Sequence, residues 1–283
     1  MTGEKKRSYR SSYGVLLPHD LTRAMSREER RTNAVRDQGA PDGLFRAAMD
    51  EIRGSHSLGQ SLRTAALSAG LMSDARCYAE LLAQFYLATA ALEARLGAAL
   101  PATEPLAAAV RAACGYSFTE GYEADLASLL GPEWRKAVAE RLTTEPARRY
   151  VARLENAGDA ELAAAAFILW GPLAIGGGAA LKPRVRSAFG EGATHVFSSV
   201  TEGGSEGRKR RRDGFIAAYD VLVGADDVET FEAVTMHVGQ LMAMNNDMML
   251  ACRQRPWWSK YLWGGAVLAA LGAGALYYER SRR

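Results

Sequence analysis

Apolar and small residues recur at three- and four-residue steps from Leu44 to about residue 252. This is the spacing of one face of an α-helix. Leu44, Ala48 and Ile52 begin the pattern, and no stretch alternates apolar and polar residues as a half-buried strand does. The sequence therefore predicts a single all-α domain over residues 44–253.

Caps and breakers divide this domain into successive helices. Ser73 or Asp74 is suited to cap a long helix that continues to Leu96, and the stretch PATEPL at residues 101–106 interrupts the pattern. Gly131–Pro132 predicts a turn, and Pro146 is suited to the first turn of another helix.

The end of the domain contains a glycine-rich basic stretch. Residues 203–212 read GGSEGRKRRR, which predicts a loop. Two helices are expected after it, at about 213–223 and 227–252. The basic cluster is equally consistent with a solvated loop and with contacts to anionic lipid headgroups or to a reductase.

The last thirty residues, 254–283, predict a membrane anchor. Residues 261–278 hold 18 uncharged residues, or about 27 Å of helix, close to the thickness of the hydrocarbon core of a bilayer. Tryptophans and a tyrosine mark the first end of the run, two tyrosines mark the other end, and arginines follow. We expect one C-terminal transmembrane helix, in a mitochondrial or endoplasmic reticulum membrane, with a buried core helix as the alternative interpretation.

Composition predicts two kinds of partner for this anchor. Its many glycines and alanines permit close approach to another helix, so subunits of a membrane complex are expected partners beside membrane lipid. Residues 1–43 are rich in Lys and Arg without sustained apolar periodicity, which predicts a disordered basic arm. A net charge of only +3 does not indicate a nucleic-acid partner.

An ordered set of segments resembles the heme oxygenase family. The set comprises LFRAAMDEIRGSHSLGQSL, FYLATAALEARL, GPEW, PARRYVARL and GGGAALK, together with Asn245 in LMAMNND. The resemblance covers residues 44 to about 252 and the C-terminal anchor. It implies a heme oxygenase-like helical fold in which heme, both cofactor and substrate, lies between two helices.

On the proximal side, the resemblance implies that His56 is the axial ligand of the heme iron. Gly59 would leave room for the ring, and Gln60 stands where the family has a glutamate that orients the imidazole. An amide accepts the same hydrogen bond but supplies no charge, so we expect a less basic ligand.

On the distal side, Gly177 and Gly178 match the glycines at which the family's helix bends over the ring. Arg53 and Arg212 fall at positions that face the heme propionates.

One departure from the family concerns catalysis. The family's distal helix carries an aspartate that anchors a water network for proton delivery, and here Ala174 or Pro172 stands at that position, depending on the register. No acidic residue occurs from Leu162 to Ala180. Pro172 is also expected to break the helix upstream of itself.

A second candidate ligand, His237, lies among methionines. It is suited either to a metal or second heme face or to ordinary packing.

Three functions therefore remain open. The first is a membrane-bound heme oxygenase that takes electrons from a reductase and opens the ring. The second is a non-catalytic subunit or scaffold of a membrane complex, in effect a pseudoenzyme. The third is a protein that binds heme through His56 for sensing or delivery.

Overall fold

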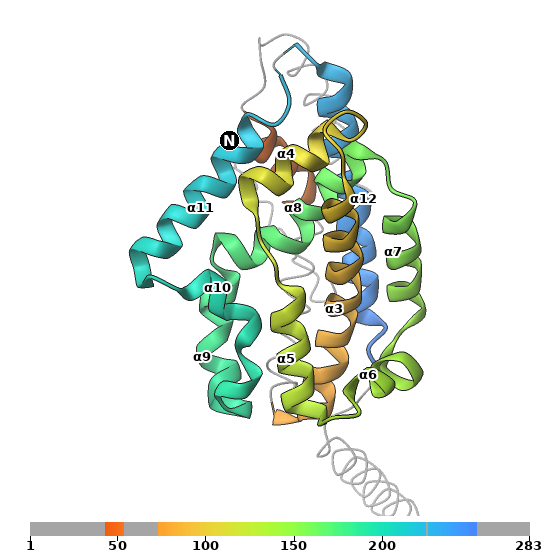
Figure 1. Ribbon diagram of the computed structural model, residues 1–283, viewed down its shortest axis with the longest axis vertical. Helices are drawn as coiled ribbons and strands as arrows, with labels where there is room; N and C mark the ends of the chain where they lie inside the picture. Colours follow the sequence, from red (N-terminus) through yellow and green to blue (C-terminus); the bar gives the residue numbers. More distant parts are fainter. Residues whose placement is uncertain (1–42, 54–72, 225, 254–283) are drawn as a thin grey trace, which may run out of the picture. The chain divides into compact units, whose positions relative to one another are not determined.

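The computed structural model describes residues 43–53, 73–224 and 226–253, all within the unit Gly43–Arg283. These residues form helices and turns without a strand, which confirms the all-α class for this part of the chain (Figure 1). The helices are residues 44–53, α3 (Ala75–Ala98), α4 (Pro105–Cys114), α5 (Thr119–Leu130), α6 (Trp134–Ala137), the π-helical turn η2 (Val138–Leu142), α7 (Glu145–Glu155), α8 (Asp159–Ile175), α9 (Gly177–Phe189), the short turns η3 (Glu191–Ala193) and η4 (His195–Phe197), α10 (Ser198–Thr201), α11 (Gly204–Asp220) and α12 (Val228–Leu250).

The helix α8 lies at the centre of the core. Every residue from Leu162 to Gly171 is buried, and α3, α4, α9, α11 and α12 pack around it (Figure 1). A helix that is apolar on all sides is stable in water only when neighbouring helices cover it. The apolar composition of α8 therefore requires the other helices to pack around it.

Several predicted boundaries are confirmed. Asp74 is the N-cap of α3, and its side chain accepts a hydrogen bond from the backbone N–H of Arg76 at 3.0 Å. The helix α4 begins at Pro105, and α5 ends immediately before the predicted turn at Gly131–Pro132.

The prediction of a loop at residues 203–212 is wrong. The helix α11 begins at Gly204, directly after Gly203, whose φ of 72° lies in the left-handed region. The guanidinium of Arg211 donates to the carbonyl oxygens of Val200 and Glu202 in the preceding turn. Arginine and lysine are good helix formers, and these bonds supply tertiary support that glycine content does not reveal.

The segment between α9 and α10 is fastened to α5 by a buried carboxylate. Asp125 accepts hydrogen bonds from the backbone N–H groups of His195 (2.6 Å) and Val196 (3.1 Å) and is fully buried. One turn earlier on α5, a Cβ added at Gly121 would lie 2.7 Å from the Cα of Val196. The two residues together bring the backbone of η4 against α5.

Within the described residues, no single helix is long and apolar enough to cross a membrane, although the bent pair α8–α9 meets the criteria of length and composition. The expected anchor at 261–278 and the expected arm at 1–43 lie outside the described residues, apart from Gly43.

Asp125 should make stability depend on pH. Burial raises its pKa to about 6, although the N–H groups of Val196 and His195 act in the opposite direction. Its contribution to stability is therefore present below about pH 4, the unfolded pKa, and is lost as the pH rises through about 6. Between pH 7 and pH 4, the unfolding free energy of the wild type should rise relative to that of Asp125→Asn by about 2–3 kcal/mol.

Urea denaturation at each pH measures this difference. Asp247→Asn, a change at an exposed aspartate of α12, serves as the control and should follow the wild type. Parallel curves for the wild type and Asp125→Asn would contradict the prediction.

Candidate functional site

The most distinctive backbone feature is a bend between α8 and α9. The two helices meet at 64°, and Gly176 between them has a φ of 141°, which side chains rarely tolerate. At Gly177, an added Cβ would lie 2.5 Å from the carbonyl oxygen of Pro172. The bend therefore requires glycine at both positions.

Pro172 does not break the helix upstream, so that expectation is wrong. The helix α8 continues through Pro172 to Ile175. The proline forfeits one backbone donor, its ring is exposed to solvent, and its own carbonyl oxygen accepts the N–H of Gly176. The break instead comes at Gly176, where the backbone turns into the left-handed region. Ala174, the other position considered for the missing carboxylate, is buried.

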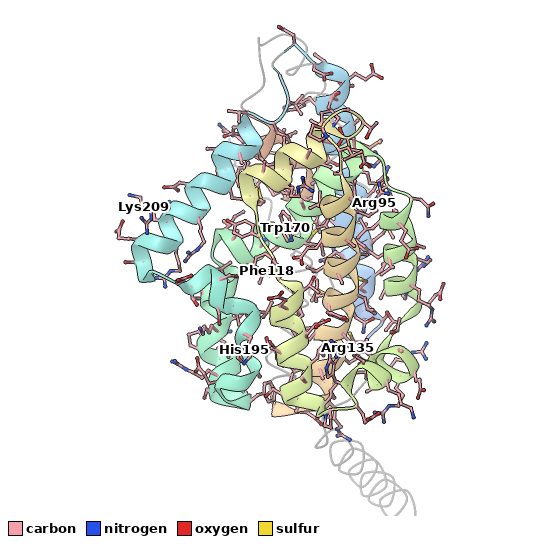
Figure 2. The ribbon with its side chains drawn as sticks, in the orientation of Figure 1. Arg95, Phe118, Arg135, Trp170, His195 and Lys209 are labelled. Carbon is pink, nitrogen blue, oxygen red and sulfur yellow. The ribbon has the colours of Figure 1, made fainter. Side chains whose placement is uncertain are left out.

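An open surface pocket of about 380 Å³ lies between this bend and α11. It is lined by Ile175, Gly176, Ala179, Ala180, Ser205, Arg208, Lys209 and Arg212. One wall is thus apolar or bare backbone, and the other carries three cations. We call it the cationic pocket. Figure 2 shows Lys209 on the outer side of α11.

The cations of the cationic pocket differ in their availability. Arg212 forms an ion pair with Asp213 at 2.9 Å. Arg208 and Lys209 are exposed and form no ion pair among the described residues. The pocket also borders the first turn of α9, whose N-cap, Gly176, offers no side-chain acceptor. The positive end of a helix dipole favours an anion. The pocket is suited to a ligand with an acidic edge and an apolar body.

The interior beside the bend is apolar and aromatic. Phe167 on α8 contacts the rings of Phe45 and Phe215, and Trp170 contacts Tyr116. The indole N–H of Trp170 is buried and has no hydrogen-bond partner, and Figure 2 shows this residue inside the bundle. Because an indole N–H can only donate a hydrogen bond, Trp170 cannot act as a base in proton transfer.

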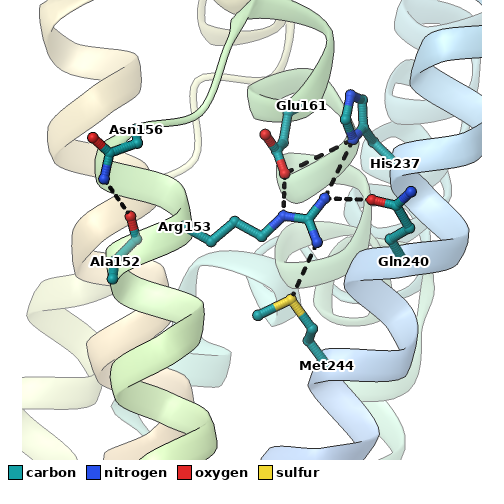
Figure 3. A network of polar contacts seen from close by, with 7 residues as sticks. All are labelled: Ala152, Arg153, Asn156, Glu161, His237, Gln240 and Met244. Carbon is teal, nitrogen blue, oxygen red and sulfur yellow. Dashed lines mark hydrogen bonds and ion pairs between the residues drawn. The ribbon is translucent and has the colours of Figure 1, made fainter.

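Figure 3 shows a polar network that joins α7, α8 and α12. Arg153 forms an ion pair with Glu161 and donates to Gln240, and its guanidinium lies 3.5 Å from both the Nδ1 of His237 and the sulfur of Met244. A guanidinium thus occupies the space between the side chains that would have to ligate a metal, so we favour packing for His237. Among the described residues, no three His, Cys, Asp or Glu side chains form a metal-binding group.

The structure places only some of the predicted site residues. His56, Gly59 and Gln60 lie outside the described residues. Arg53 forms an ion pair with Asp50, with 76% of its side chain exposed. Arg212 lines the cationic pocket beside the bend, where Gly177 is exposed.

Gly178 is buried in the first turn of α9. A Cβ added there would lie 2.9 Å from a methyl group of Val200. The roles of Gly177 and Gly178 beside heme stay predictions.

The sequence placed Arg208 and Lys209 in the basic cluster but did not predict that they lie beside the glycine bend. Arg208 and Arg212 are four residues apart, which places them on one face of a helix. This four-residue spacing is visible in the sequence, but it has no meaning in the loop that was predicted for residues 203–212.

The network around Arg153 predicts unequal costs for two arginines of α7. Arg153→Ala should lower the unfolding free energy by about 1–3 kcal/mol, because Glu161 is 13% exposed and would keep only His237, whose Nδ1 lies 3.8 Å from its carboxylate. Arg148→Ala removes an exposed pair with Glu145 and should cost at most about 0.5 kcal/mol. Chemical denaturation of both variants measures the difference, and equal costs would rule out a special role for the network.

Comparison with known proteins shows a fold likeness. No protein-family model matches the chain, and no curated protein matches it. Among solved structures, heme oxygenase 2 from Chlamydomonas reinhardtii, without heme, aligns with a TM-score of 0.66 and 23% identity over 75% of this chain and 98% of that one.

Two cyanobacterial structures are similarly close. Heme oxygenase-2 from Synechocystis sp. PCC 6803, in complex with heme and NO, aligns with a TM-score of 0.62 and 21% identity over 74% of this chain and 85% of its own. Heme oxygenase-1 from the same organism, in complex with heme, gives 0.60 and 18% over 83% and 98%. The chain therefore has a heme oxygenase-like fold.

Proposed function

We propose that this protein binds heme with the acidic edge of the ring in the cationic pocket and His56 as iron ligand. The observation that carries the proposal is the pocket itself. It brings Arg208 and Lys209, which form no ion pair among the described residues, beside the glycine bend of a heme oxygenase-like fold. The solved structures of similar fold include two in complex with heme.

The residues of the pocket fit the chemistry of heme. Heme is a flat apolar ring with two carboxylates on one edge. The pocket has apolar side chains and glycine backbone on one side and three cations on the other. A Cβ placed on Gly176 would meet nothing within 4 Å, so this part of the bend faces open space. Arg208 and Lys209 would hold the carboxylates, and Arg212 would contribute less because Asp213 partly neutralises its charge.

Bound heme would supply an iron atom able to bind a diatomic gas. The reactivity at that atom would depend on the chain's own residues. His56 would hold the iron through a neutral imidazole, with Gln60 as a weaker orienting partner than a carboxylate. The distal helix offers apolar and aromatic side chains and no acid from Leu162 to Ala180, so it excludes water without directing a proton. We therefore propose heme binding with severely reduced ring opening.

A second candidate is a non-catalytic subunit or scaffold of a membrane complex. The acid-free distal helix and the glycine-rich run at 261–278 support it. In both proposals the domain is held at a mitochondrial or endoplasmic reticulum membrane by that C-terminal run, which contacts lipid and neighbouring subunits. A reductase partner belongs only to a catalytically active form.

Charge reversal in the pocket should weaken heme binding. The double variant Arg208→Glu/Lys209→Glu should raise the hemin dissociation constant about tenfold or more, because two attractive cations become anions that repel the heme carboxylates. Arg210→Glu, an exposed change on the same helix outside the pocket lining, is the matched control. Titration of the full chain in detergent, followed by the Soret band, measures both.

His56→Ala in the same titration tests the iron ligand. It should remove the Soret shift of the wild type while the helical circular dichroism stays unchanged. If hemin binds but the pocket variant is no weaker than Arg210→Glu, the ring lies elsewhere. If the wild type shows no Soret shift, heme binding is excluded and the scaffold function is favoured.

Ring opening should be slow. General acid catalysis typically contributes 10²–10⁴-fold, so the hemin-loaded protein, given oxygen and a reductant, should form biliverdin at least about 100-fold more slowly than a cyanobacterial heme oxygenase assayed beside it. Ala174→Asp should raise the yield if the buried register is the relevant one, and Pro172→Asp is the control for the other register. A wild-type yield equal to that of the cyanobacterial enzyme would refute this prediction.

A further inference from the structure

One hydroxyl group lies among the cations of the cationic pocket. Ser205 lines the pocket together with Arg208, Lys209 and Arg212. The three cations follow Ser205 by three, four and seven positions along α11, which places all four residues on one face of that helix. Ser205 is exposed, and its side chain forms no hydrogen bond to the other residues that the structure describes. The hydroxyl is therefore accessible and already lies beside positive charge.

The turn before Ser205 is open to solvent. Residues 202–206 are all exposed, and Gly203 and Gly204 have φ values of 72° and 61°, in the left-handed region. Figure 1 shows the start of α11 at the left edge of the described helices. Exposed turns of small and polar residues are the segments that other enzymes reach most easily. Ser205 is thus accessible to a modifying enzyme as well as to solvent.

We propose that Ser205 is a phosphorylation site whose phosphate group occupies the cationic pocket. In this reaction the Oγ of Ser205 forms a bond to the terminal phosphorus of a nucleoside triphosphate. The bond from that phosphorus to the nucleoside diphosphate breaks, and the hydroxyl proton passes to a base of the kinase. The product carries a charge of about −1.5 to −2 and three strong acceptor oxygens. It supplies the counter-charge that Arg208 and Lys209 lack among the described residues.

Helix direction and local charge both favour a phosphate at this position. Ser205 is the second residue of α11, and the N-cap residue, Gly203, provides no side-chain cap. The helix dipole stabilises a phosphate in the first turn, and neighbouring arginines form charge-assisted hydrogen bonds to it. The carboxylates of Glu202 and Glu206 oppose it, but neither residue lines the pocket, whereas three cations do. The balance of charge around the phosphate is therefore attractive.

The wall that carries the cations is held in place at both ends. Near its start, Arg211 donates to the carbonyl oxygens of Val200 (3.0 Å) and Glu202. At the other end of α11, the carboxylate of Asp220 accepts the backbone N–H of Phe45. A phosphate in the pocket thus meets cations on a helix that is already fixed, so little loss of backbone freedom offsets the attraction.

Phosphorylation of Ser205 excludes the acidic edge of heme from the pocket. This consequence rests on the proposed function, in which Arg208 and Lys209 hold the heme carboxylates. The phosphate pairs with the same two side chains and repels a second anion. Ser205 is therefore a switch that lowers the affinity for heme while leaving the apolar wall of the pocket unchanged.

Phosphorus NMR of the full chain in detergent tests where the phosphate lies. Phosphoserine is incorporated at position 205 or, as the matched control, at position 199, which is exposed on α10 and outside the pocket lining. The second pKa of phosphoserine is ordinarily about 6. It should be lower at position 205 than at position 199, because nearby cations favour the dianion. Arg208→Ala/Lys209→Ala should remove the difference, and equal pKa values at the two positions would overturn the occupancy of the pocket.

Hemin titration of the same proteins, followed by the Soret band, tests the switch. Phosphoserine at position 205 should raise the hemin dissociation constant about tenfold or more, whereas phosphoserine at position 199 should leave it close to that of the unmodified chain. Ser205→Ala keeps the cations and cannot be phosphorylated, so it should bind hemin like the wild type. Equal dissociation constants for the two phosphoproteins would contradict the switch.

Mass spectrometry of the protein isolated from its native cells tests the modification itself. With phosphatase inhibitors present, a fraction of the chains should carry phosphate on Ser205. The Ser205→Ala variant expressed in the same cells should lose this phosphopeptide, which secures the assignment. Chains without phosphate at Ser205 under these conditions would overturn the modification.

The two proposals fail in different ways. A wild-type protein without a Soret shift ends the heme proposal and the control of heme affinity, but phosphorus NMR still decides whether the phosphate occupies the pocket. A normal hemin titration together with equal phosphate pKa values leaves heme binding intact and ends the proposal for Ser205.

Discussion

The burial of α8 on all sides is the constraint on which the rest of the described structure depends. Because Leu162 to Gly171 offer no polar face, solvent cannot border any side of this stretch. Its charged side chains are confined to the N-terminal end, where Asp159 accepts the N–H groups of Leu106 and Ala107 of α4 and Glu161 pairs with Arg153. One carboxylate at the start of α8 thus orients α4, and the next joins α7 and α12.

The same apolar character limits the chemistry. A proton-delivering site needs groups that exchange protons close to the reacting atom, and the interior part of α8 contains alanine, phenylalanine, isoleucine, leucine and tryptophan. The apolar side chains that let α8 pack in the core cannot hold a network of water molecules. The polar and charged side chains near the bend come instead from α11, at the rim, where they are suited to binding an anion and remote from proton transfer.

Local signals predicted the helices well because their caps and breakers are local. Asp74, Pro105 and Gly131 act within a few residues of themselves, and the structure confirms all three boundaries. The start of α11 depends on Arg211 bonding to carbonyl oxygens nine and eleven residues earlier, which glycine content does not reveal. The prediction that Pro172 breaks the helix was also wrong because of tertiary packing. The helices that cover α8 keep it continuous although Pro172 has no backbone N–H to donate. The roles of His56, Gly59 and Gln60 stay predictions.

Asp220, the last residue of α11, accepts a hydrogen bond from the backbone N–H of Phe45 at 3.2 Å, and this contact constrains the rotation of α11 about its own axis. Arg208 and Asp220 are twelve residues apart on one continuous helix, so their directions around its axis differ by a fixed angle of about 120°. Inserting one residue between them would rotate one relative to the other by about 100°. Substitutions are thus tolerable along much of α11, but its length between these two residues is not free to change. A one-residue insertion between Arg208 and Asp220 would therefore turn the cationic pocket out of its present orientation relative to the helix at 44–53.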